Sequence, residues 1–142
     1  MLAGQIALIA ASLFTGAAVY INVAEQPARL GLDDRALLAE WKPSYQRGFV
    51  MQASLAVISG VFGLFAWWSA NDWRWAAGAV MMLANWPYTL LGIMPTNLKL
   101  QAIHFENADA ASRALIVKWG YLHAVRSGLG LSATLAYLWA LN

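Results

Sequence analysis

Two side chains of this sequence, His123 and Arg126, combine chemical reactivity with a position inside an apolar stretch. An imidazole titrates near neutral pH and can take a proton as a general base. An arginine stays charged and can hold an anionic group. The two residues are three apart, so a helix presents them on one face. We predict that this pair is catalytic. The simpler alternative is a neutral histidine bonded to a neighbouring helix and an arginine that extends to the membrane interface and pairs with Glu25.

Further candidates for substrate binding lie in or beside the apolar stretches, most of them on small or polar helix faces. They are Asn22, Glu25, Gln52, Asn85, Trp86, Tyr88, Thr89 and Asn97. Each face follows from a rotation of about 100° per residue along a helix. Polar groups exposed to lipid have no hydrogen-bond partner, so we expect these faces to meet inside a helical bundle.

The chain has few side chains that could hold a metal. It contains no cysteine, which excludes disulfides, thiolate nucleophiles, thiolate-bound zinc and iron–sulfur centres. His104, His123 and Glu25 have the ligand types of a non-haem iron site, but no spacing supports this alternative, and no metal site is predicted. The sequence favours no cofactor and leaves metal or haem binding open.

The elements that position these residues follow from composition. Of the 142 residues, 61% are hydrophobic and only 11% are charged, whereas about 25% of a soluble domain is charged. We predict an all-α polytopic membrane protein, a four-transmembrane-helix bundle that forms one domain over residues 1–142. A span needs about 20 apolar residues, and the four predicted spans cover about residues 2–23, 49–68, 75–94 and 119–141. A signal peptide is the alternative for the first stretch, which lacks a basic leading region.

Seven of the nine Lys and Arg residues lie in the connections 24–48 and 95–118. Cytoplasmic loops carry an excess of these residues, so we predict that both connections are cytoplasmic and both termini lie outside, as in a bacterial inner membrane. The net charge of +2 gives no reason to expect nucleic acid. The expected partners are the lipid bilayer and a small hydrophobic molecule, and a homo-oligomer stays open.

Local signals predict short interfacial helices in both connections. Asp33 is expected to cap one that Pro43 ends, a second runs from Thr96 or Asn97 to His104, and Asp109 is the expected N-cap of the fourth span. Pro87 should bend the third span. Aromatic residues at both ends suggest interfacial belts, the inner one formed by Trp41, Tyr45 and Trp119 and the outer one by Trp67, Trp68, Trp73, Trp75 and Trp139.

Most of the polar residues within the predicted spans lie at a similar depth in the membrane. With a rise of about 1.5 Å per residue, Asn22, Gln52, Thr89, His123 and Arg126 lie roughly 5–12 Å inside the predicted cytoplasmic boundary. Asn85 lies deeper and Glu25 lies close to the boundary. All four helices thus contribute polar groups at a similar depth, which predicts a site that opens from the cytoplasmic leaflet.

Several motifs together resemble a known family. They are Asn22-Val-Ala-Glu25-Gln-Pro27-Ala-Arg29, Glu40-Trp41, Tyr45-Gln-Arg47-Gly48, Pro87-Tyr-Thr89, Met94-Pro95-Thr96-Asn97 with Leu100, and Trp119-Gly-Tyr-Leu-His123-Ala-Val-Arg126. They are similar to the anthrone oxygenase-like integral membrane family, also described as domain of unknown function 1772. The resemblance covers essentially the whole chain. It implies an oxidoreductase that converts an anthrone to an anthraquinone with dioxygen.

An anthrone can lose its benzylic proton, and the electron-rich anion can react directly with dioxygen. Under this resemblance, His123 would be the base, and Arg126 with Asn22, Gln52 or Asn97 would hold the developing oxyanion. Trp86, Tyr88 and Phe49 would supply aromatic walls. The competing function class is a non-catalytic membrane protein, either an accessory subunit or a binder of lipid, quinone or another small hydrophobic molecule. An enclosed cavity beside His123 and Arg126 would favour the enzyme.

Overall fold

The protein is helical throughout and contains no strand. The computed structural model describes residues 1–142. In chain order the elements are α1 (Leu2–Tyr20), η1 (Ile21–Glu25), α2 (Gln26–Leu30), α3 (Asp34–Ala70), α4 (Trp73–Tyr88), η2 (Thr89–Ile93), α5 (Met94–Ala102), η3 (Phe105–Asn107) and α6 (Ala110–Leu141). The elements η1 and η2 are single π-helical turns. They join α1 to α2 and α4 to α5, so the chain forms four long helical segments.

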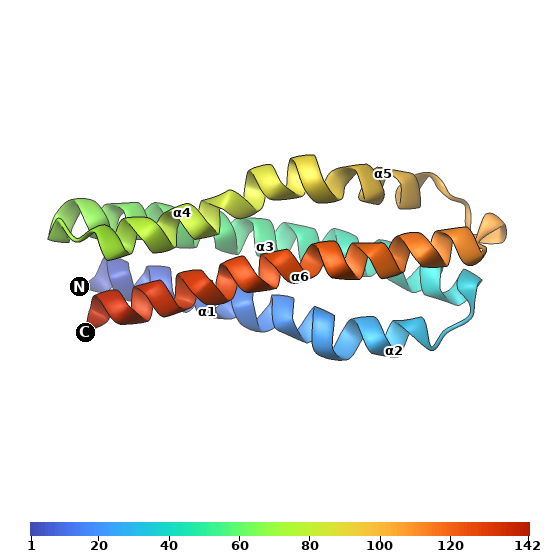
Figure 1. Cartoon of the computed structure of the whole chain (residues 1–142), viewed down its shortest axis with the longest axis horizontal. Coiled ribbons are helices and arrows are strands. Elements are labelled where there is room, and N and C mark those ends of the chain that lie inside the picture. Colours follow the sequence, from blue (N-terminus) through green and yellow to red (C-terminus); the bar gives the residue numbers. More distant parts are fainter.

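The four segments lie side by side and alternate in direction (Figure 1). Helix α1 packs against α3 and α6, and α4 packs against the same two helices from the other side. Both termini lie at the end that holds the α3–α4 turn, and the α2–α3 and α5–α6 connections lie at the opposite end (Figure 1). The arrangement agrees with the predicted helix count and with the prediction that both termini share one end.

Capping residues define both ends of α3 and the beginning of α6. Asp33 accepts a hydrogen bond from the Ala36 N–H, and Asp109 forms a capping box with Ser112. Both N-caps are therefore confirmed. Asn71 ends α3 with φ 52°, a left-handed conformation that asparagine tolerates better than most residues.

The prediction that Pro43 ends a short interfacial helix is wrong. Pro43 lies inside α3, which continues without a break from Asp34 to Ala70. An internal proline costs about 3 kcal/mol. Leu37, Leu38 and Trp41, just before it, are all completely buried, and burial of each such side chain contributes about 1.5–3 kcal/mol. Packing therefore outweighs the broken hydrogen bond.

The second predicted interfacial helix is also absorbed into a longer segment. Met94–Ala102 forms α5, which continues from α4 through η2. The bend expected at Pro87 stays a prediction, but the π-turn η2 begins two residues after this proline, at Thr89. A proline removes one backbone donor, and a wider turn is one way to accommodate the loss.

Three segments are long and apolar enough to cross a membrane, namely Leu2–Leu30, Asp34–Ala70 and Trp73–Ala102. The fourth predicted span is not among them, although α6 has 32 residues. Its composition is less apolar because one face carries His123, Arg126, Ser127 and Thr134. The helix that carries the two predicted catalytic residues, α6, is thus the least apolar of the four.

Two apolar clusters fill the interior. One, nearer the termini, includes Phe14, Trp75, Met82 and Tyr137. The other, nearer the opposite end, includes Trp41, Leu100, Ile116 and Trp119. Helices α3, α4 and α6 each contribute residues to both clusters. On each helix a buried polar residue lies between its two contributions, namely Gln52, Asn85 and His123. A polar layer therefore separates two apolar cores.

The predicted aromatic belts are only partly correct. Trp67, Trp68, Trp73 and Trp139 are exposed near the termini, but Trp75 is buried in the first cluster. Trp41 and Trp119 are also buried, with their rings 5.8 Å apart in an edge-to-face arrangement. These tryptophans fill the interior because small residues such as Gly4, whose absent Cβ would overlap the Trp75 ring, leave room for them.

Candidate functional site

Arg126 is a buried cation without an acidic partner. Its exposure is 6%, its guanidinium forms none of the salt bridges or hydrogen bonds of the protein, and its buried Nε has no partner. The guanidinium carbon lies 5.5 Å from the centre of the Phe14 ring, an attractive but incomplete compensation for the charge. The alternative pairing of Arg126 with Glu25 is wrong, because Glu25 pairs with Arg29.

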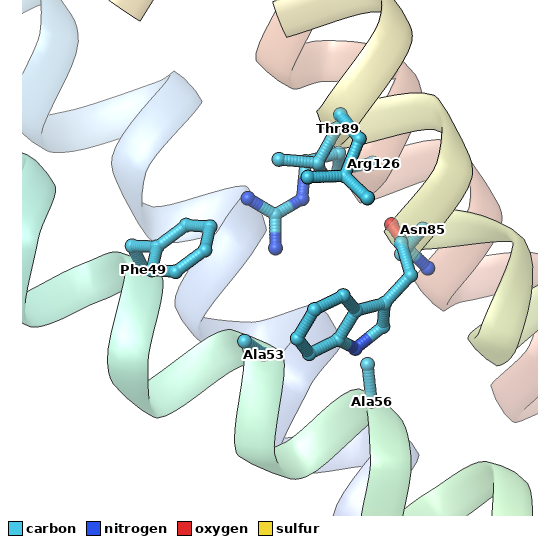
Figure 2. A pocket seen from close by; sticks show the side chains of 8 residues that line it. Phe49, Ala53, Ala56, Asn85, Thr89 and Arg126 are labelled. Atoms are coloured by element: carbon cyan, nitrogen blue, oxygen red, sulfur yellow. The ribbon is translucent and has the colours of Figure 1, made fainter. Parts of the chain in front are cut away.

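Arg126 lines two small cavities. The first is bounded by Phe49 and Ala53 of α3 and by Asn85 and Thr89 of the facing segment, and the guanidinium projects between these two sides (Figure 2). The second lies toward the α2–α3 end and is lined by His123 among others. Their volumes are about 10 Å³ and about 20 Å³, and each has room for about one water molecule.

Unpaired polar atoms converge on the second cavity. Gln52 Nε2, both amide atoms of Asn97, and Trp119 Nε1 are buried without a hydrogen-bond partner, and all three residues line this cavity together with Arg126. An unpaired buried polar group costs about 1–3 kcal/mol. Three neutral donors beside an unpaired guanidinium form a site suited to an anionic or strongly polar oxygen.

His123 is held by one fixed hydrogen-bond network. Its Nδ1 lies 3.0 Å from Asn22 Oδ1, which also accepts a hydrogen bond of 2.8 Å from the Ser127 hydroxyl. The Asn22 Nδ2 donates to the Gly120 carbonyl over 2.9 Å. The second imidazole nitrogen, Nε2, has no hydrogen bond, and the Trp119 ring stacks at a tilt with its centre 5.0 Å from that of His123. Asn22 therefore contacts His123 rather than the cavity.

Glu25 belongs to a separate charged cluster. Its Oε1 accepts hydrogen bonds from Arg29 and Ser44, and Arg29 Nε lies 3.1 Å from Glu40 Oε2. Arg29 is 3% exposed and its guanidinium carbon lies 5.7 Å from the Trp119 ring centre. The Glu25–Arg29 spacing of four residues is a regular helical ion-pair signal, and it could have identified the true partner of Glu25.

Of the candidates on the segment formed by α4 and η2, some line the first cavity and one makes a structural contact. Asn85, Trp86 and Thr89 line the cavity. Asn85 Nδ2 donates to backbone carbonyls of its own helix, but its Oδ1 is buried and unpaired. Tyr88 instead donates through its hydroxyl to the Leu122 carbonyl over 2.8 Å. It joins α4 to α6 and does not line either cavity.

The alternative metal set is not assembled. No three His, Asp or Glu side chains come together in an arrangement that could hold a metal ion. His104 is exposed between α5 and η3, Glu25 pairs with Arg29, and His123 bonds to Asn22. The three proposed ligands therefore have different surroundings, as their unrelated spacing already suggested.

Sequence reasoning missed the roles of three residues that line the second cavity. Ser44, Tyr45 and Trp119 lie there with His123, although the two aromatic residues were expected at the membrane interface. The spacing of Trp119, one turn before His123, gives a usable signal because residues four apart share a helix face. Ser44 lies beside Pro43 and carries no comparable signal.

The fold and site define a class of protein: a small helical protein with membrane-length apolar helices around a buried basic and polar site. The sequence comparisons give the family. The anthrone oxygenase family matches residues 41–136, and the chain belongs to this family. No solved structure matches the chain.

The relatives with curated names are fungal anthrone oxygenases. The anthrone oxygenase of Claviceps purpurea is 28% identical over 144 residues, covering 92% of this chain and 83% of that protein. Anthrone oxygenase tpcL of Aspergillus fumigatus is 32% identical over 134 residues, covering 85% and 81%. Anthrone oxygenase nsrD of Aspergillus novofumigatus is 28% identical over 137 residues, covering 85% and 82%. They give no support to the predicted bacterial origin.

Proposed function

We propose that this protein is a membrane oxygenase that oxidises a lipophilic anthrone or related phenolic polyketide-type compound with dioxygen. The observation that carries the proposal is Arg126, a buried cation without an acidic partner, beside unpaired donors of Gln52, Asn97 and Trp119. Such a group of donors stabilises an oxyanion that forms during a reaction. The family of the chain supplies the chemical class.

The reaction begins with a proton transfer. His123 takes a proton from the methylene carbon opposite the anthrone carbonyl, and the electron pair of the broken C–H bond moves into the ring system, so that negative charge develops on the carbonyl oxygen. Arg126, Gln52 and Asn97 hold this oxygen. The central ring is aromatic in the anion but not in the neutral ketone, so negative charge at this oxygen grows as the proton leaves. The donors therefore bind the product of the step more strongly than the substrate.

Dioxygen is the oxidant in the next step. It forms a C–O bond at the deprotonated carbon and is itself reduced to a peroxide, which takes back a proton from His123. His123 then removes the second C–H proton, and the electron pair of that bond forms the carbonyl group as the O–O bond breaks. The hydroxide that leaves takes the proton from His123 and becomes water. One anthrone and one dioxygen thus give one anthraquinone and one water, and His123 and Arg126 end in their starting states.

The substrate needs more space than the closed site offers, because each cavity holds about one water. An open groove of about 470 Å³ runs along the lipid-facing side of α3, lined by Val50, Ser54, Val57 and Ile58. Ala53 and Trp86 line both this groove and the Arg126 cavity. We propose that a planar apolar substrate approaches sideways from the bilayer and that displacement of the half-exposed Trp86 opens the site.

The placement in the membrane follows the charge distribution. All four long segments are proposed to cross the bilayer, with α6 shielded from lipid along its polar face by its neighbours. The end that carries the connections 24–48 and 95–118 is proposed to face the cytoplasm, with both termini outside. A location in the inner membrane of a bacterium is expected only from the distribution of Lys and Arg residues, so we propose an integral membrane location without naming the membrane.

The first experiment measures oxygen uptake by the protein in detergent or nanodiscs with 1,8-dihydroxyanthrone, corrected for oxidation without protein. Arg126→Met and His123→Gln should each lower kcat/KM by about 10²–10³-fold, whereas His104→Gln should retain activity as a matched histidine control. Full turnover by folded His123→Gln and Arg126→Met proteins would refute the proposed site.

The second candidate function, binding of a small hydrophobic molecule without catalysis, is supported by the mainly apolar groove along α3. Binding of the anthraquinone product without any oxygen uptake, in a sample whose metal content and visible spectrum have been recorded, would support this function. A stoichiometric metal or a haem band in that sample would instead replace the metal-free proton-transfer chemistry proposed above.

The proposed access route has its own test. Ala53→Trp should fill the passage between the groove and Arg126 and lower kcat/KM for the anthrone at least about tenfold, because displacement of a few ångströms suffices to disturb a reacting geometry. Val61→Trp, also on α3 but outside both cavities and the groove, is the matched control. Equal activity of the two variants would exclude access past Ala53.

A further inference from the structure

We propose that Asn22 is a positioning residue that fixes the neutral His123 ring with its proton on Nδ1, so that the lone pair of Nε2 is free to accept a proton in the Arg126 site. The inference deepens the proposed function by assigning the basic atom and the residue that selects it. It rests on hydrogen-bond geometry that involves no substrate.

The orientation of the Asn22 amide can be assigned from its partners. Gly120 offers a backbone carbonyl, which only accepts hydrogen bonds, at 2.9 Å from the Asn22 Nδ2. The reversed amide would bring two oxygens to that distance without a hydrogen between them. The nitrogen must therefore face Gly120, and Oδ1 must face His123 and Ser127.

The tautomer of His123 follows from this assignment. Oδ1 of Asn22 has no hydrogen to donate, so the His123 Nδ1 at 3.0 Å can form the hydrogen bond only if it carries the proton. In a neutral imidazole the other nitrogen is then an acceptor. Nε2 has no hydrogen bond within the protein, and His123 lines the cavity that contains Arg126. The free lone pair is thus available to a substrate C–H group.

The local fold explains how Asn22 reaches this position. The π-turn η1 carries Asn22, and one turn later Gln26 makes a second hydrogen bond of the same kind, from its Nε2 to the Ile116 carbonyl over 2.8 Å. A Cβ at Gly120 would lie 2.8 Å from the Gln26 amide nitrogen, so any larger residue there would displace the Gln26 side chain from its present position. Asn22 and Gln26 differ in that only Asn22 touches His123.

This pair supplies a matched control. Asn22→Leu and Gln26→Leu each remove one amide that donates to an α6 carbonyl, and each should weaken packing by a similar amount. Only the first change removes the acceptor of His123 Nδ1. Ser127→Ala removes the other donor to Asn22 and leaves the contact between Asn22 and His123 in place, so it should not change the tautomer.

The experiment is nitrogen-15 NMR of histidine-labelled protein in detergent at alkaline pH, where imidazole is neutral. The chain has two histidines, so His104→Gln leaves His123 as the single signal. The expected spectrum shows a protonated Nδ1 and an unprotonated Nε2. Asn22→Leu should shift the population to the Nε2–H form that dominates in free histidine, whereas Gln26→Leu and Ser127→Ala should keep the Nδ1–H form.

Kinetics complete the test. Asn22→Leu should lower kcat about 10–100-fold with little change in KM, a loss comparable to that of other residues that orient an imidazole, while Gln26→Leu should retain the kcat of the wild type. An Nε2–H signal in the protein with Asn22 intact, or an unchanged tautomer in Asn22→Leu, would overturn the inference. An Nδ1–H signal in a protein that consumes no oxygen would uphold the inference and refute only the proposed function.

Discussion

Replacement of Arg126 by methionine should make the protein more stable and inactive at the same time. Arg126 is 6% exposed and has no acidic partner or hydrogen bond. The buried charge therefore destabilises the folded state, and the surrounding residues do not compensate for it. Methionine has a similar length, fits irregular space and carries no charge, so Arg126→Met tests whether the charge is kept for function or for structure.

The size of the gain follows from two opposing contributions. Insertion scales assign a cost of about 2.5–3.5 kcal/mol to an arginine at the centre of a membrane helix. The contact with the Phe14 ring at 5.5 Å returns about 0.5–2 kcal/mol. The expected net stabilisation on replacement is about 0.5–3 kcal/mol. In a chain of 142 residues this corresponds to a rise in Tm of roughly 2–9 °C.

The assay is thermal or SDS-induced unfolding in detergent, followed by tryptophan fluorescence, with oxygen uptake measured on the same samples. Arg47→Met is the control, because Arg47 is exposed and forms no salt bridge, and its replacement should change stability by no more than about 0.5 kcal/mol. A loss of more than 1 kcal/mol in Arg126→Met would show that the guanidinium supports the fold and would refute the reasoning.

Two further predictions concern the end near the termini. Gly78→Leu should destabilise the protein by about 1–3 kcal/mol, because even a Cβ at Gly78 would overlap the Tyr137 ring, whereas Gly128→Leu, with open space around it, should be tolerated in the same unfolding assay. The Arg74 side chain donates hydrogen bonds to the Asp72 carboxylate and lowers the pKa of Asp72 below its ordinary value of 3.8. A carboxyl group with a lowered pKa in the folded state stabilises the protein at pH values above its unfolded-state pKa, and this stabilisation is lost as the pH falls through the folded-state pKa. The wild type should therefore have a higher Tm than Asp72→Asn near neutral pH, and this difference should disappear in acid. A Tm difference that stays constant with pH would contradict this.

The sequence predicts best where one residue acts through its own helix. Asp33 and Asp109 are recognisable as N-caps because capping depends on the next three residues. The polar layer is also recognisable, since charge and amide groups are rare inside apolar spans. His123 and Arg126 share a cavity lining as their spacing suggested, although their catalytic roles stay predictions.

The errors arise where tertiary packing competes with a local rule. Pro43 should end a helix, yet burial of Trp41 and its neighbours holds the helix together on both sides. The alternative that paired Glu25 with Arg126 overlooked Arg29, which lies four residues after Glu25 and forms the ion pair. That Asn22 binds substrate stays a prediction, whereas the structure gives its amide three hydrogen bonds inside the protein, two at Oδ1 and one at Nδ2.

The unpaired groups also distinguish the kind of ligand that the site is built for. A water oxygen accepts only two hydrogen bonds, so a single water in the second cavity could satisfy only two of the three donors of Gln52, Asn97 and Trp119. It could not neutralise Arg126, whose charge lies at the same place. A neutral ketone oxygen is limited in the same way. An oxyanion both accepts hydrogen bonds from these donors and balances the charge of Arg126. Under the proposed function, the site would therefore complement the deprotonated substrate better than the neutral one, and this difference would accelerate proton removal.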